Sequence, residues 1–224
     1  MDNFNDLIKA TMKKIMICIC FAILTGSLSS QNTKTIVLNS PDLKRGLPVM
    51  EALSLRASAA EFTSKELNLQ DLSDLLWAAN GINRKEIGKR TAPSALNAQD
   101  IDIYMIAKEC IYIYDALNHV LNLVVSGDHR DLVAGRQVDV AKAPVILLLV
   151  SDISRFKTGE EASKLNWAAL DAGIVSQNIA IFCAGVGLQT KPRVSMDQQK
   201  LREILHLKDS QHLMINNPVS YKNE

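Results

Sequence analysis

No charge of one sign dominates this sequence. Its 224 residues include 25 Lys and Arg against 24 Asp and Glu, so the net charge is +1 at pH 7. A chain this close to neutral lacks the positive field that attracts a phosphate backbone. We therefore expect no nucleic-acid partner.

Cysteine is scarce too, with only four residues in the chain. Four are too few for a small disulfide scaffold. Cys18 and Cys20 fall in a segment that we expect to be removed. Cys110 and Cys183 are expected to be buried free thiols, with a disulfide as the alternative.

Motifs of common catalytic and metal sites are missing. The four histidines lie without the spacing of metal ligands. The sequence has no nucleophile elbow, no Walker loop and no GxGxxG after a strand. We therefore predict no metal site and name no catalytic side chain.

The overall composition is that of a globular protein. Apolar residues make up 47% and charged residues 22% of the chain, which excludes disorder, collagen and coiled coil. The length allows one domain, or two small ones, with a sizeable core.

The first thirty residues have the pattern of a secretory signal peptide. A basic stretch, Met12–Lys14, precedes an apolar run, Ile15–Leu24, and small residues follow up to Ser30. This order predicts residues 1–30 as a signal peptide, cleavage after about Ser27 to Ser30, and export to the periplasm or the extracellular space. Met12 is a possible true start. A retained membrane anchor is the alternative, but the run is short for a span.

Beyond the leader we expect a linker over 31–47 and one domain over 48–224. The longest helix, 164–185, is apolar nearly all round, which is typical of a central core helix or a subunit interface. Helices and strands do not alternate regularly, so the sequence predicts an α+β fold. Other helices are predicted over 48–55, 69–80 (with Ser64 as a cap before it and Asn80-Gly81 as its end) and 197–205, and strands over 102–107, 110–115, 118–125, 143–151 and 212–216.

Three segments carry chemistry that the core does not need. Arg56 followed by Ser58 can hold a phosphate by charge and hydrogen bonds, or can simply end a helix. The polar turn 90–99 can offer backbone groups and amides to a heteroaromatic edge, or can be only a turn. The stretch 172–188 combines small residues, a Gln-Asn pair and a Gly-x-Gly stop on an apolar helix.

In this order the three segments resemble the FMN-dependent nitroreductase superfamily, and most nearly its SagB-type branch of thiazoline and oxazoline oxidases. The resemblance extends from Pro48 to the C-terminus. The strings that carry it are Leu75–Gly81 (LLWAANG), Arg90–Ala95 (RTAPSA), Asp171–Gly173 (DAG), Gln177-Asn178 and Gly187-Leu188.

The resemblance implies a nitroreductase-like fold. Its mixed or antiparallel sheet is flanked by helices, and an intertwined homodimer holds two FMN molecules at the subunit interface. It also implies ping-pong hydride transfer through flavin N5 to a small planar acceptor, with a nicotinamide or another compound as electron donor.

The resemblance further implies a set of FMN contacts. One group holds the phosphate and ribityl chain, a loop packs on the flavin, an Asn meets its polar edge, and backbone N–H groups reach N5 and O4. Arg56, Ala57 and Ser58 match the first group, and Pro93, Ser94 and Ala95 match the loop. Asn97 matches the Asn, and the stretch Pro192–Ser195 falls at N5 and O4, with Val194 and Ser195 as the named contacts. Lys222 is the one cation near the C-terminus that can join the phosphate site.

Departures from the family pattern weaken the expected phosphate site. Ala57 and Ala60 stand where basic residues are frequent, and no Gly occurs at Val194-Ser195. Losing two or three cations predicts FMN binding about 10-fold to 10³-fold weaker. A degenerate, non-catalytic member that binds a flavin or another planar ligand is therefore the alternative function.

Overall fold

The computed structural model describes residues 35–222. The signal peptide expected over 1–30, with Cys18 and Cys20, lies outside the described residues. Cys110 and Cys183 are both buried free thiols, as predicted.

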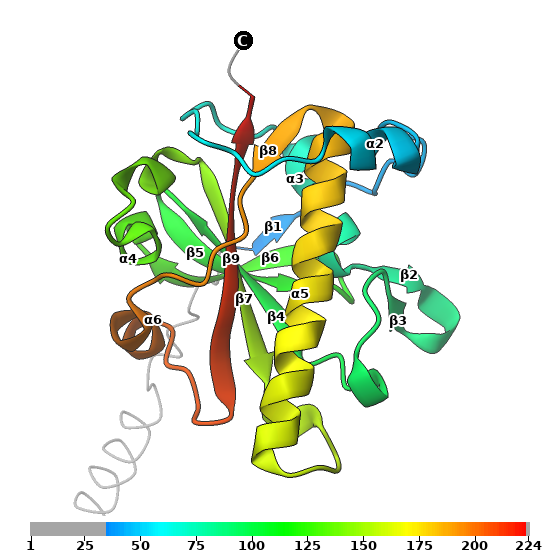
Figure 1. Ribbon diagram of the computed structural model, residues 1–224, viewed down its shortest axis with the longest axis vertical. Helices are drawn as coiled ribbons and strands as arrows, with labels where there is room; N and C mark the ends of the chain where they lie inside the picture. The colour runs from blue at the N-terminus through cyan, green and yellow to red at the C-terminus, as the bar shows by residue number, and fades with distance from the viewer. Residues whose placement is uncertain (1–34, 223–224) are drawn as a thin grey trace, which may run out of the picture. The chain divides into compact units, whose positions relative to one another are not determined.

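A seven-stranded antiparallel sheet forms the centre of the domain (Figure 1). Its strand order is β1-β6-β5-β4-β7-β9-β8. The β2-β3 pair forms a separate two-stranded hairpin. The strands are β1 (Thr35–Val37), β2 (Ile82–Arg84), β3 (Lys89–Arg90), β4 (Ile101–Ala107), β5 (Cys110–Asp115), β6 (Val120–Ser126), β7 (Val145–Asp152), β8 (Leu188–Thr190) and β9 (Gln211–Tyr221).

Helices cover both faces of this sheet, which confirms the α+β class. The long helix α5 and α3 pack on one face, and the short helices α4 and α6 pack on the other. The helices are α2 (Val49–Leu55), α3 (Leu69–Asn80), α4 (Arg130–Ala134), α5 (Glu161–Val186) and α6 (Gln198–Ile204), with 3₁₀ turns η1 (Lys85–Ile87), η2 (Ala95–Asn97), η3 (Val138–Lys142) and η4 (Ile153–Arg155).

The core has two parts because strand side chains alternate between the faces. In the central strand β7, Leu147 and Leu149 point to the α3 and α5 side, whereas Ile146 and Leu148 point to the α4 and α6 side. All four are fully buried, so this strand is buried on both faces, as its continuous apolar run predicts.

Helix α5 is the organising element of the first core. It is one turn longer at its start than predicted, and Gly187 ends it in the left-handed conformation with φ 80°. In residues 35–222 it is the one helix long and apolar enough to cross a membrane, but half of that stretch is buried within the domain. It therefore serves here as a core helix with a partly exposed apolar side.

Some local predictions need correction. Asn68, not Ser64, caps α3, because its side chain accepts the N–H of Asp71. Gly81 is extended, with φ −73°, and not left-handed. Strand β9 continues to Tyr221, five residues beyond the predicted end, because it pairs with both β7 and β8.

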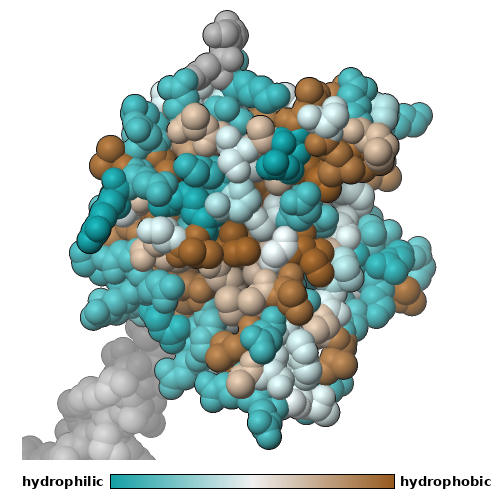
Figure 2. All heavy atoms as spheres, viewed as in Figure 1, coloured by the Kyte–Doolittle hydropathy of each residue, from teal (hydrophilic) through white to brown (hydrophobic). Residues whose placement is uncertain are grey.

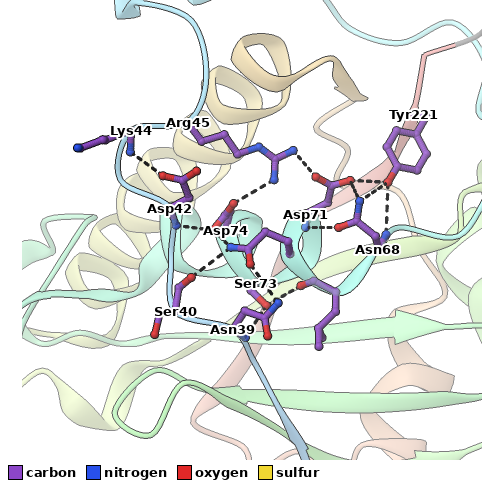
Figure 3. Close-up of polar contacts among 12 residues, drawn as sticks. Asn39, Ser40, Asp42, Lys44, Arg45, Asn68, Asp71, Ser73, Asp74 and Tyr221 are labelled. Atoms are coloured by element: carbon purple, nitrogen blue, oxygen red, sulfur yellow. Dashed lines mark hydrogen bonds and ion pairs between the residues drawn. The ribbon is translucent and has the colours of Figure 1, made fainter.

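The expected linker 31–47 contributes to the fold from Thr35 onward. Strand β1 pairs with β6 at the sheet edge. Residues 38–45, which we call the N-terminal strap, then lie along α3. Figure 3 shows how polar groups join them: Asn39 N–H donates to Ser73 Oγ at 2.9 Å, and Arg45 forms ion pairs with Asp71 and Asp74.

Candidate functional site

A cavity of about 190 Å³ opens where the end of α2, β8 and the end of β9 meet. Arg56 ends α2 in an extended conformation. The chain then pairs with β8 through a Ser58–Thr190 bridge, and Ala59 N–H donates to the Thr190 carbonyl at 2.9 Å. Ala57, Ser58 and Lys222 line this cavity. The structure thus brings together residues 57, 58 and 222 of the predicted phosphate site.

The polar groups around this cavity suit an anion. Thr190 is one of the residues that line the cavity, but its Oγ1 is buried beneath the cavity surface and lacks a hydrogen-bond partner within the described part of the chain. Arg56 does not line the cavity, although Leu55 and Ala57 on either side of it do. It is exposed and forms no ion pair within residues 35–222. A buried hydroxyl without a partner costs stability unless a ligand or water pairs with it.

Cys183 also lines the cavity but is not suited to covalent chemistry. Complete burial raises the pKa of its thiol far above the usual range. The thiol stays protonated at neutral pH and is a poor nucleophile.

The segment after β8 presents free backbone donors. Arg193 anchors it: the main chains of Arg193 and Asn216 exchange two hydrogen bonds of 2.9 and 2.7 Å. The Arg193 guanidinium is buried and bonds to the Val133 and Ala134 carbonyls, and burial lowers its pKa. Within 35–222 no acceptor bonds to the N–H of Val194 or Ser195, and both residues are exposed. These are the two donors assigned to flavin N5 and O4.

The predicted flavin loop is held in a strained conformation. Leu96, Asn97 and Gln99 all have positive φ, between 49° and 55°. Such angles are costly for residues other than glycine and often mark functional sites. Three side chains hold the loop: Asp171 accepts Ala95 N–H, Ser94 Oγ accepts Gln99 N–H, and Arg90 bonds to the Gln99 amide.

A buried acid pair supports this loop. Asp100 and Asp171 are both buried, and Ser151 Oγ donates to Asp100 Oδ2 at 2.5 Å. Burial raises the pKa of Asp100 to about 7, and the neighbouring Asp171 carboxylate adds to the increase. A proton on Asp100 relieves the repulsion between the two carboxyl groups.

Within one chain, the predicted flavin loop lies far from the phosphate cavity. Pro93 and Ser94 lie beside Asp171 on α5, whereas the cavity lies beside Cys183. Twelve residues of helix separate the two points, which is about 18 Å. Loop and cavity are therefore separate regions along the same helix.

Three residues of the candidate site were not assigned a role from the sequence. Thr190 has no local signal, because its position depends on pairing with Ser58 and β9. Asp171 belongs to a string that signals the family, but its bond to Ala95 joins residues 76 positions apart. Arg193 lies within the predicted N5 segment, where only its neighbours were assigned a role.

Comparison with known proteins defines the family. The family model described as "Nitroreductase family" matches residues 53–219. The chain therefore belongs to the nitroreductase family, a family of oxidoreductases.

Individual relatives agree with this assignment. A protein of Methanocaldococcus jannaschii, named provisionally as a nitroreductase, is 27% identical over 199 residues, covering 85% of this chain and 98% of the relative. A crystal structure of a Ralstonia eutropha protein, also provisionally named a nitroreductase, has a TM-score of 0.80 at 31% identity. The match covers 87% of this chain and 92% of that chain. The microcin synthetase complex of E. coli contains a chain with a TM-score of 0.67 at 16% identity, covering 89% of this chain and 84% of that one, and this likeness shows the fold alone.

Proposed function

We propose that this protein is an FMN-dependent oxidoreductase that passes electrons to small planar acceptors. The observation that carries the proposal is the cavity lined by Ser58 and Lys222, with the exposed Arg56 between the lining residues Leu55 and Ala57. Hydroxyl donors and two cations are the groups that a phosphate monoester needs. Flavin is the general cofactor of the family to which the chain belongs.

The residues of the chain divide the work of binding and orienting the cofactor. Arg56, Ala57, Ser58 and Lys222 would hold the phosphate end, and the free N–H groups of Val194 and Ser195 would bond to the flavin edge. When bound, FMN supplies hydride acceptance and donation at its N5 position. A donor at that edge stabilises reduced flavin, so these two N–H groups tune the chemistry without a catalytic side chain.

The complete site requires a second copy of the chain. Pro93, Ser94, Ala95 and Asn97 lie about 18 Å along α5 from the phosphate cavity, so we assign them to the flavin of the partner subunit. An apolar surface is available for pairing. Met50 on α2 is 73% exposed and Leu170 on α5 is 66% exposed. Figure 2 shows apolar atoms gathered where α2 crosses the end of α5.

Within the family we place the chain in the SagB-type branch, on the strings at 75–81 and 90–95. We further propose that the mature protein is exported, and that a nicotinamide or another donor reduces it. The second candidate function, a non-catalytic binder, is favoured by Ala57 and Ala60, which replace phosphate-binding cations.

Stopped-flow reoxidation tests the proposal. Protein loaded with FMN and reduced by dithionite is mixed with menadione. We expect rapid reoxidation by the wild type and by Ser195→Ala, which keeps the N–H donor. Ser195→Pro removes that donor and should slow the reaction by about 10²-fold to 10³-fold. A Ser195→Pro protein that holds FMN and reacts at the wild-type rate would contradict the assignment of this segment.

A further inference from the structure

A second cavity shares none of its lining residues with the cavity beside Ser58. It measures about 390 Å³, in the size range of small-molecule sites. It lies between the N-terminal strap, the end of α3, the β2 region and the turn between β5 and β6. Its apolar wall consists of Leu38, Pro41, Trp77, Ile82, Ala116 and Leu117.

Hydrogen bonds fix each wall of this cavity to the next. His119 joins the strap to the turn: its ring bonds to the Asn39 carbonyl at 2.9 Å and to the Tyr114 hydroxyl at 2.8 Å. Trp77 Nε1 donates to the Ile82 carbonyl at 3.1 Å and so joins α3 to β2. The strap itself is held on α3 by the polar contacts of Figure 3. The cavity is thus formed before any ligand arrives.

The Trp77 side chain makes the interior of this cavity apolar. Because Trp77 already uses its N–H, the ring offers only carbon surface to a ligand. Leu117 at the tip of the turn is 78% exposed and gives the cavity an apolar rim. His119 has a φ of 52°, a strained angle at the same turn.

Among the residues that line this cavity, Lys85 is the one Lys, Arg, Asp or Glu. Lys85 lies in the lining, and within 35–222 no carboxylate lies at ion-pair distance from its ammonium group. Burial lowers the pKa of His119, the Asn39 carbonyl and the Asp74 carboxylate oppose this, and Lys85 adds a smaller decrease, so charges of both signs act on this wall. An anionic group bound here would neutralise a cation that now lacks a partner.

We propose that this cavity binds a small planar aromatic anion, with its ring on Trp77 between Ile82 and Leu117 and its carboxylate on Lys85. The site is separate from the flavin site, and the proposal does not depend on flavin binding.

Isothermal titration of the purified full chain with 2-naphthoate tests this proposal, with the neutral 2-naphthamide as matched ligand. We expect a Kd for naphthoate between about 10 µM and 1 mM and about 10-fold weaker binding of the amide. Lys85→Gln should remove the preference for the anion. Lys89→Gln is the matched control, because Lys89 lies outside the cavity lining.

The exposed Leu117 provides a variant whose folding should be unaffected. Leu117→Asp should weaken both ligands by at least about 10-fold through lost apolar contact, and should weaken the anion further through like-charge repulsion. If millimolar naphthoate gives no heat of binding, the proposal is overturned. Binding that is unchanged in Lys85→Gln and Leu117→Asp, or that FMN displaces, also overturns it, because the ligand then occupies another site.

Discussion

The carboxylate of Asp171 accepts the backbone N–H of Ala95, with its two oxygens at 2.9 and 3.0 Å from that nitrogen. This contact joins the middle of the longest helix to the loop that we assign to the partner's flavin. It orients the loop next to Leu96 and Asn97, which both adopt left-handed angles. Helix α5 thus holds the strained loop in place through Asp171.

Removing this acceptor should release the loop. Asp171→Ala leaves the Ala95 N–H without its partner, and we expect the free energy of unfolding to fall by about 1–3 kcal/mol, with weaker FMN binding. Asp171→Asn keeps an acceptor oxygen and should lose less of both. Urea unfolding and FMN titration at pH 6 give the two quantities. Equal losses in the two variants would show that the acceptor oxygen at position 171 does not hold the loop.

The acid pair predicts a dependence of stability on pH. The pKa of Asp100 is raised from 3.8 to about 7 in the folded chain, so the folded state binds more protons between these values. The contribution of Asp100 to the free energy of unfolding should therefore be highest below pH 4. It should fall as the pH rises to about 7.

Asp100→Asn isolates this effect, because the amide can replace the protonated carboxyl. The variant should match the wild type below about pH 4, already exceed it near pH 5, and exceed it by about 1–4 kcal/mol at pH 8. Urea unfolding of both proteins across this range measures the difference. A constant difference at all pH values would rule out Asp100 as the titrating group.

Arg56 should contribute much of the phosphate affinity, since Ala57 and Ala60 cannot assist. Arg56→Ala should weaken FMN by about 2–3 kcal/mol, which is about 30-fold to 150-fold in Kd. Arg84→Ala removes an exposed arginine on β2, outside the cavity beside Ser58, and serves as the control. Flavin fluorescence titration gives both constants. Equal constants for Arg56→Ala and the wild type would make Arg56 a helix-end residue only.

Pairing through α2 and α5 should make the protein a dimer at micromolar concentration. Leu170→Asp places a charge on the exposed apolar side of α5, twice per symmetric dimer, and should raise the dimer dissociation constant by at least about 10²-fold. Ile87→Asp changes an equally exposed residue on η1 and should have no effect. Light scattering after size exclusion distinguishes the species. A monomeric wild type would contradict the two-copy site.

Local pattern was enough to predict most elements of the fold. The apolar runs of α5 and β7 and the helical spacing of α3 predict their type and nearly their bounds, because each element buries a face that its own sequence encodes. Strand β1 and the last residues of β9 were missed, since each is defined by pairing with a distant strand.

The site was predictable only where a motif marks it. Ser58 and Lys222 were singled out, and the structure places them around one cavity. Their neighbour Thr190 and the Asp100–Asp171 pair have no local signature, because burial and partners 50 to 150 residues away create their chemistry. A motif can therefore single out residues that line a cavity, whereas the buried groups around them become visible only in the fold.

Titration of the flavin-free protein with FMN tests the central claim most directly. Absorbance and flavin fluorescence are followed as FMN is added to a known concentration of chain. We predict a bound flavin spectrum that saturates at one FMN per chain, or two per dimer, with competition by inorganic phosphate at the Ser58 cavity. A protein that remains colourless after removal of free FMN, with no change in flavin fluorescence during the titration, would contradict the account and leave the non-catalytic alternative.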